Sequence, residues 1–120
     1  MPPAEEAMRA MLIGLFSVIL VVMIGVTVWA GSNSSLLDPA VRAAYNAQPW
    51  AIATLFDAYC GFITFFVWVA YRERGVGIKL LWLVLILVLG NIAMSSYVLL
   101  QLFRMKQGEP LMSLLAPRAA

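Results

Sequence analysis

The sequence contains no histidine, and its one cysteine, Cys60, lies inside a long apolar run. Histidine is the commonest general base in enzymes and the commonest metal ligand, so its absence removes most hydrolytic and metal-dependent chemistry. A single cysteine excludes a disulfide bond within the chain. The acidic residues form no cluster, and there is no glycine-rich phosphate loop. We therefore predict no catalytic, metal-binding or cofactor-binding residues, and a protein that is not an enzyme.

Charged residues are also scarce. They make up 12% of the 120 residues, whereas hydrophobic residues make up 63%. A soluble domain of this length needs many more charges to cover its surface, and a chain of this length suits one domain. The composition therefore indicates a single integral membrane domain over residues 1–120, in contact with membrane lipids. The net charge of +2, without a basic run, argues against binding to nucleic acid.

Three apolar segments are long enough to cross a bilayer, at about residues 7–30, 49–72 and 78–103. In lipid the backbone must satisfy its own hydrogen bonds, so each segment is expected to be helical. About 20 helical residues cover roughly 30 Å, the thickness of the hydrocarbon layer. The predicted fold is all-α, with three transmembrane helices. Cleavage of the first segment as a signal peptide stays open as an alternative, although its apolar run exceeds the usual length of about 7–15 residues.

The connections between these segments carry helix-start and turn signals. Asp38 is an N-cap residue and Pro39 a first-turn proline, and together they predict a short interfacial helix at about residues 39–47. The segment 72–79 is short and contains two glycines and three basic residues. It predicts a tight turn, so the second and third transmembrane helices are expected to form an antiparallel hairpin.

Orientation is read from basic residues near the helix ends. With three spans, the two termini lie on opposite sides of the membrane. The basic residues divide evenly between these sides, but Arg72, Arg74 and Lys79 are concentrated next to helix ends. They favour a cytoplasmic turn. We therefore expect a multi-pass protein of a bacterial inner membrane, with a cytoplasmic N-terminus and a C-terminus outside.

Aromatic and basic residues near the ends of the spans are typical of interface anchors. A pigment or quinone stacked on the aromatic rings is the alternative role for them, and contact with an anionic lipid is the alternative for the basic residues. Neither is needed to explain their positions, so no cofactor is predicted. The predicted anchors are Trp29, Trp50, Tyr71, Arg72, Arg74, Lys79 and Trp82.

Asp57 is a carboxylate well inside the second apolar segment, about 12 Å from its start at Pro49. Counted from the middle of the 72–79 turn, Asn91 and Ser95 lie at a similar depth on the third segment. These two residues are one helical turn apart and share a face. The sequence therefore predicts a polar intramembrane cluster of Asp57, Asn91 and Ser95. Such a cluster either ties two helices together or carries protons or cations.

Several short motifs run through the second and third segments, and they are Pro49-Trp50, Thr54-Leu55, Asp57 with Tyr59, Trp68-Val69, Tyr71-Arg72-Glu73, Gly90-Asn91-Ile92, Tyr97 and Leu100-Gln101-Leu102-Phe103. With these motifs the region 49–103 resembles a family of small bacterial and plant membrane proteins that carries only an uncharacterised-domain label. The resemblance implies that Asp57 and the Tyr71-Arg72-Glu73 exit belong to the family pattern. It implies no activity. Asn91 stands where plant members are expected to have serine.

Two functions fit a protein of this kind. The first is a non-catalytic accessory or assembly subunit of a larger membrane complex, of respiratory or photosynthetic type, that binds other membrane protein subunits. The second is a small transporter, or a proton or cation conduit, built as an oligomer around Asp57 because three helices are too few to enclose a path. We expect the first, since no second intramembrane acid, lysine or histidine is present to continue a proton relay.

Overall fold

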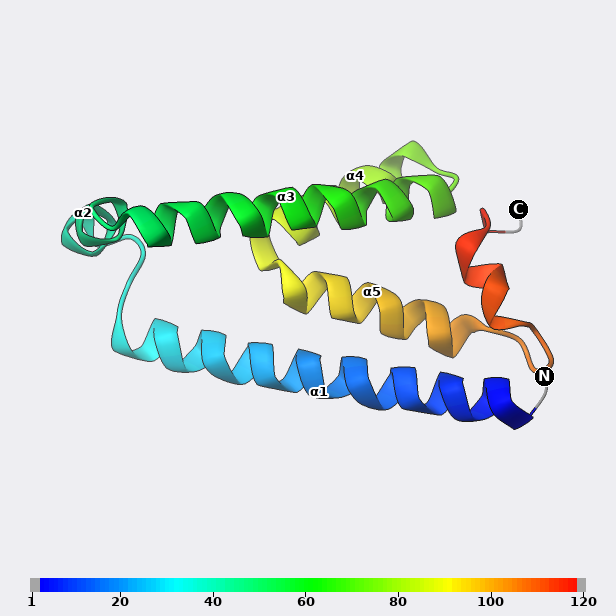
Figure 1. Cartoon of the computed structure of the whole chain (residues 1–120). Helices are drawn as coiled ribbons and strands as arrows, with labels where there is room; N and C mark the ends of the chain where they lie inside the picture. Colours follow the sequence, from blue (N-terminus) through cyan, green and yellow to red (C-terminus); the bar gives the residue numbers. More distant parts are fainter. Residues whose placement is uncertain (1–2, 119–120) are drawn as a thin grey trace.

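The computed structural model describes residues 3–118, which contain five α-helices and one short 3-10 helix but no strand. The all-α prediction is confirmed. The helices are joined by short connections and form an elongated molecule (Figure 1). Their bounds are α1 Pro3–Asn33, α2 Pro39–Asn46, α3 Pro49–Arg72, α4 Val76–Leu89, α5 Asn91–Arg104 and η1 Leu111–Leu115.

α1 and α3 are each long and apolar enough to cross a membrane. α1 contains no buried residue, and Val69 and Arg72 are the buried residues of α3. The apolar side chains of both helices therefore face mostly outward, which is the reverse of a helix in the core of a soluble protein. Apolar surface of this extent requires lipid or another protein chain to cover it.

The starts of α2 and α3 follow the predicted signals. The Asp38 carboxylate accepts a hydrogen bond from the Ala40 N–H at 2.9 Å, and Pro39 occupies the first turn of α2. Pro49 has the same place in α3, which ends at Arg72 as predicted. The short helix and the second apolar helix thus have the expected bounds.

The prediction of one continuous helix over residues 78–103 is wrong. The helix breaks at Gly90, whose backbone adopts φ 56° and ψ −123°. Such a conformation is costly for any residue with a Cβ atom. A Cβ on Gly90 would lie 2.7 Å from the ring of Phe62 on α3, so the close approach of α3 also requires glycine here. The break divides the segment into α4 and α5, each 14 residues long.

After the break the chain reverses direction. α4 packs along α3, and α5 then returns along α1 towards the end where α4 began (Figure 1). Arg9, near the start of α1, donates two hydrogen bonds to the carbonyl of Leu102, near the end of α5, at 2.8 and 3.1 Å. α4 and α5 therefore form a helical hairpin. Its tip at Gly90 lies against Phe62, ten residues or about 15 Å from the end of α3.

The hairpin decides where the ends of the described chain lie. Three complete crossings would place residues 3 and 118 at opposite ends of the molecule. Both instead lie at the end that holds the C-terminus of α3 (Figure 1). The backbone N–H of Arg118 donates to the Arg72 carbonyl at 2.8 Å, which fixes the C-terminal segment there. The described chain thus has two full-length apolar helices and one half-length hairpin, in place of three spans.

The core is small and lies between α3 and the hairpin. Its centre is Tyr97 of α5, which is fully buried. Three rings from α3 and α4 meet Tyr97 edge-on, with centroid distances of 6.1 Å to Phe65, 5.3 Å to Trp68 and 4.9 Å to Trp82. Edge-to-face rings attract one another beyond the effect of burying their area. These contacts fix the hairpin against α3 at the end where the polar groups gather.

Candidate functional site

The structure does not bring the predicted polar cluster together. Asp57 and Asn91 are exposed, and Ser95 is buried. The Ser95 hydroxyl donates to the Asn91 carbonyl of its own helix at 2.5 Å. Within residues 3–118, no hydrogen bond joins the Asp57 carboxylate to either residue. The depth comparison assumed a continuous third helix, and the reversal at Gly90 removes that assumption.

Asp57 instead lies on an exposed part of α3. Ala53, Gly61 and Thr64, which follow the same helical stripe, are exposed as well. Small and polar side chains therefore form a stripe on α3 that the described chain leaves uncovered.

The predicted interface anchors separate into two groups. Trp29, Trp50, Tyr71 and Arg74 are exposed, while Lys79 and Trp82 are half-buried and Arg72 is buried. Trp82 packs on Tyr97 in the core. Arg72 and Trp82 therefore have interior contacts that the assignment of interface anchors did not include.

Arg72 is the centre of a buried polar network. Its side chain is only 8% exposed, although it carries a full positive charge. Nε donates to the Gln101 side-chain oxygen at 2.7 Å, and Nη1 donates to the carbonyls of Ser113 and Ala116 at 2.8 and 2.9 Å. Arg72 thereby joins the end of α3 to α5 and to the C-terminal segment. Hydrogen bonds from an ionised group are about twice as strong as neutral ones.

Glu73 is buried beside Arg72 and continues the network. Its carboxylate accepts a hydrogen bond from the Tyr97 hydroxyl at 3.2 Å and forms an ion pair with Arg118 at 3.3 Å. The Trp68 indole N–H donates to the Leu114 carbonyl at 2.9 Å. The segment after α5 is therefore held to the end of α3 by the side chains of Trp68, Arg72 and Glu73.

A basic pocket of about 400 Å³ opens beside this network. We define the basic pocket by the four cationic side chains and the one carboxylate that line it, which are Arg72, Arg104, Lys106, Arg118 and Glu109. The single carboxylate in the lining does not neutralise the four cationic side chains. Among residues 3–118 no group of three potential metal ligands occurs. The excess of cationic side chains in the pocket favours anions over cations electrostatically.

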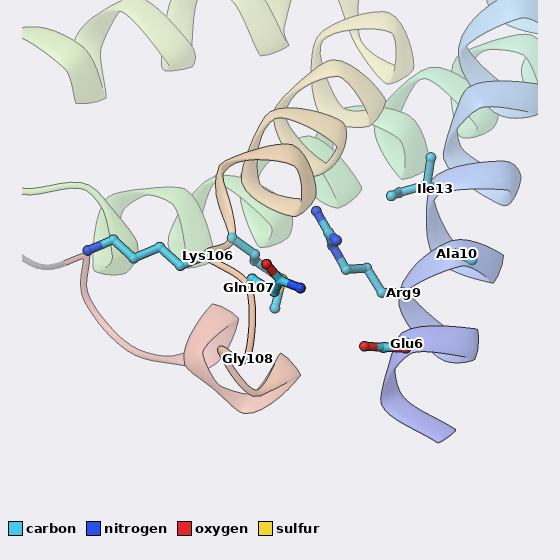
Figure 2. A pocket seen from close by; sticks show the side chains of 8 residues that line it. Glu6, Arg9, Ala10, Ile13, Lys106, Gln107 and Gly108 are labelled. Atoms are coloured by element: carbon cyan, nitrogen blue, oxygen red, sulfur yellow. The ribbon is translucent and has the colours of Figure 1, made fainter. Parts of the chain in front are cut away.

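A second cavity, of about 440 Å³, lies between the start of α1 and the turn after α5 (Figure 2). Arg9 points across it to the end of α5, where its guanidinium meets the Leu102 carbonyl. A cation at a helix C-terminus is also stabilised by the helix dipole. Lys106 lines this cavity and the basic pocket, and its side chain extends away from Arg9 (Figure 2). The second cavity therefore contains a hydrogen-bonded contact between α1 and α5.

A family model described as a protein of unknown function, DUF1475, matches residues 6–117. The chain belongs to the DUF1475 family. No curated protein and no solved structure has a significant match to the chain. The DUF1475 match includes α1 and the C-terminal segment, so it is longer than the region 49–103 that carried the resemblance. It contains Arg72, Glu73 and Gln101, and it stops one residue before Arg118.

The sequence indicates part of this polar network and not the rest. Tyr71-Arg72-Glu73 is visible as a motif, but the sequence predicts its arginine as an interface anchor, whereas the structure buries it. Gln101, a polar residue at the end of an apolar segment, was the available sign of a buried partner. The remaining partners of Arg72 are backbone carbonyls, which no side-chain pattern reveals.

Proposed function

We propose that the protein is a non-catalytic membrane subunit that binds another membrane protein through the exposed face of α3 that carries Asp57, as an accessory or assembly subunit of a larger complex. The observation that carries this proposal is the exposed Asp57 carboxylate within an apolar helix of 24 residues. An ionised carboxylate facing lipid at that depth costs about 2.5–3.5 kcal/mol on insertion scales. A partner that supplies a cation or hydrogen-bond donors would remove most of that cost.

The shape of the same face supports a helix as the partner. Ala53, Gly61 and Thr64 surround Asp57 with short side chains, and a Cβ built on Gly61 meets nothing within 4 Å. The Thr64 hydroxyl already donates to the Cys60 carbonyl at 2.9 Å, so it adds no unsatisfied donor to the face. Small residues let two helix backbones approach closely in a membrane, where packing drives association.

We expect Asp57→Asn to weaken recovery of the partner complex by at least tenfold. The charged group at the contact is lost, and truncating one side of a buried charged contact costs about 2–5 kcal/mol. The measurement is the amount of co-purifying membrane protein after extraction in a mild detergent. Asp38→Asn is the matched control, because asparagine caps α2 as well as aspartate does and Asp38 lies outside the apolar helices. Migration of the unmodified protein only as a small free oligomer would reject the proposal.

A second candidate function, an oligomeric conduit for protons or cations, is favoured by the break at Gly90. The α4–α5 hairpin ends beside the middle of α3, so the start of α5 and the exposed Asn91 lie at mid-depth. Discontinuous helices with half-helix ends at mid-membrane are the usual sites of ions and substrates in transporters. Ion flux in proteoliposomes that is the same for Asp57→Asn and the unmodified protein would rule this candidate out.

We further propose that α1 and α3 cross the membrane, that the hairpin enters and leaves on one side, and that this side is cytoplasmic. Seven of the eight basic residues lie at the end shared by the start of α1 and the end of α3, and Arg42 lies at the other. Short segments rich in lysine and arginine stay in the cytoplasm. The residues at the basic end are Arg9, Arg72, Arg74, Lys79, Arg104, Lys106 and Arg118.

This topology predicts that both ends of the chain are shielded from the outside of intact cells. With Cys60 replaced by alanine, Ser34→Cys between α1 and α2 is expected to react with an impermeant maleimide added outside. Gln107→Cys, in the turn after α5, is expected to react only after the membrane is made permeable. Labelling of both cysteines from outside would contradict this topology and support the three-span arrangement.

A further inference from the structure

The basic pocket lies between the end of α5 and the C-terminal segment, at the level where α3 ends. Four cationic side chains and one carboxylate line its volume of about 400 Å³. A phosphate group carries one or two negative charges and accepts several hydrogen bonds from arginine, lysine and hydroxyl donors. We propose that the basic pocket binds a phosphate group, either that of an anionic phospholipid or that of a free phosphate compound.

Two of the cations in the basic pocket, Arg104 and Lys106, have neither an acidic partner nor a side-chain hydrogen bond within residues 3–118. The Glu109 carboxylate accepts the backbone N–H of Lys106 at 3.0 Å. Glu73 forms its ion pair with Arg118, and this is the one ion pair found among residues 3–118. Arg104 and Lys106 are exposed and make no side-chain hydrogen bond in that part of the chain. Their charges therefore remain available for an anion.

Arg72 supplies a donor group that is already fixed in place. Three hydrogen bonds from Nε and Nη1 immobilise the Arg72 guanidinium, and none of the described acceptors takes a hydrogen bond from Nη2. Arg72 lines the pocket, so a phosphate bound beside it would meet a guanidinium that does not have to move.

The position of the pocket suits a lipid headgroup when α3 spans the membrane as proposed. Arg72 ends α3, and Trp68 and Tyr71 lie within the last turn and a half, where aromatic residues mark the headgroup level. This siting depends on the proposed membrane topology, whereas binding of a free phosphate does not. Asp57 lies 15 residues or about 22 Å from Arg72 along α3, so partner binding and phosphate binding are tested separately.

The decisive experiment removes the two unpaired cations. The double variant Arg104→Ala, Lys106→Ala is compared with Arg42→Ala, Lys79→Ala, which loses the same charge from residues outside the basic pocket. An exposed cation in direct contact with the phosphate contributes up to about 1 kcal/mol, so the pocket variant is expected to lose up to roughly thirtyfold in affinity, whereas the control, which removes no pocket residue, loses less than threefold. Native mass spectrometry of protein from nanodiscs of phosphatidylcholine with phosphatidylglycerol measures the lipid arm. Titration with inorganic phosphate in a phosphate-free detergent measures the other arm.

Each outcome of these measurements decides the proposal. Retention of phosphatidylglycerol that phosphate does not displace assigns the lipid headgroup, and saturable phosphate binding in detergent assigns a free phosphate compound. Absence of both, or equal losses in the two double variants, would overturn the proposal. The thermal stability of both double variants is measured as well, and equal stability guards against a loss of binding that arises from misfolding.

Discussion

Gly90→Ala is expected to destabilise the fold by about 2–5 kcal/mol, the sum of a strained backbone and an overpacked contact. Alanine at φ 56° and ψ −123° leaves the allowed regions, and its Cβ would lie 2.7 Å from the Phe62 ring. Relief of both problems requires a different path between α4 and α5. The measurement is the free energy of unfolding in mixed detergent micelles, followed by far-ultraviolet circular dichroism and tryptophan fluorescence.

Two variants separate the causes of the Gly90 effect. Gly77→Ala lies in α4, where a Cβ meets nothing within 4 Å, and alanine favours helix there by up to about 1 kcal/mol. Combining Gly90→Ala with Phe62→Ala removes the clash and leaves the strained backbone. The double variant is therefore expected to show less than the sum of the two single losses. If Gly90→Ala were as stable as Gly77→Ala, α4 and α5 would be one continuous helix.

Arg72→Lys is expected to cost about 3–5 kcal/mol, although it preserves the charge. The planar guanidinium reaches three acceptors on two elements at once, at 2.7 to 2.9 Å. A lysine ammonium on a longer flexible stem cannot match that geometry, so Gln101 and at least one carbonyl would lose their donor. The C-terminal segment should then detach. Limited trypsin digestion would show faster cleavage after Arg104 and Lys106, and unfolding in mixed micelles would give the free energy.

Arg42→Lys is the matched control for the Arg72 result. Arg42 is exposed on α2, and the same substitution there should change stability by no more than about 0.5 kcal/mol. Equal small effects at both positions would mean that Arg72 acts only through its charge. The buried hydrogen bonds of Arg72 would then contribute nothing to the fold.

The predictable part of the fold was the part with local signals. Asp38 and Pro39 begin α2, and Pro49 begins α3, because capping and first-turn proline act within a few residues. Gly90 gives no such signal. One glycine within an aliphatic run is tolerated in a helix, and the residue that explains its role, Phe62, lies on another helix. The break therefore depends on tertiary packing that periodicity does not report.

The candidate site divides in the same way. Asp57 stood out by itself because a carboxylate in an apolar segment is unusual whatever surrounds it. Its predicted contacts with Asn91 and Ser95 depend on the course of the chain after residue 90, which no local pattern reports. The burial of Arg72 could not be predicted, because its position in the sequence is an ordinary one for an exposed residue. An arginine at the end of a span is normally solvated, and only the folded position of Gln101 and the C-terminal carbonyls shows that it is buried.

The half-length of the α4–α5 hairpin has a consequence for the shape of the protein in a bilayer. In the proposed topology, with the tip at Gly90 beside the middle of α3, one leaflet contains parts of four helices and the other contains only α1 and α3. The cross-section is therefore larger in the leaflet next to the basic end. A wedge of this form favours a bilayer that curves around the narrow end of the protein. In the leaflet with the smaller cross-section, it leaves room for a partner chain beside Asp57.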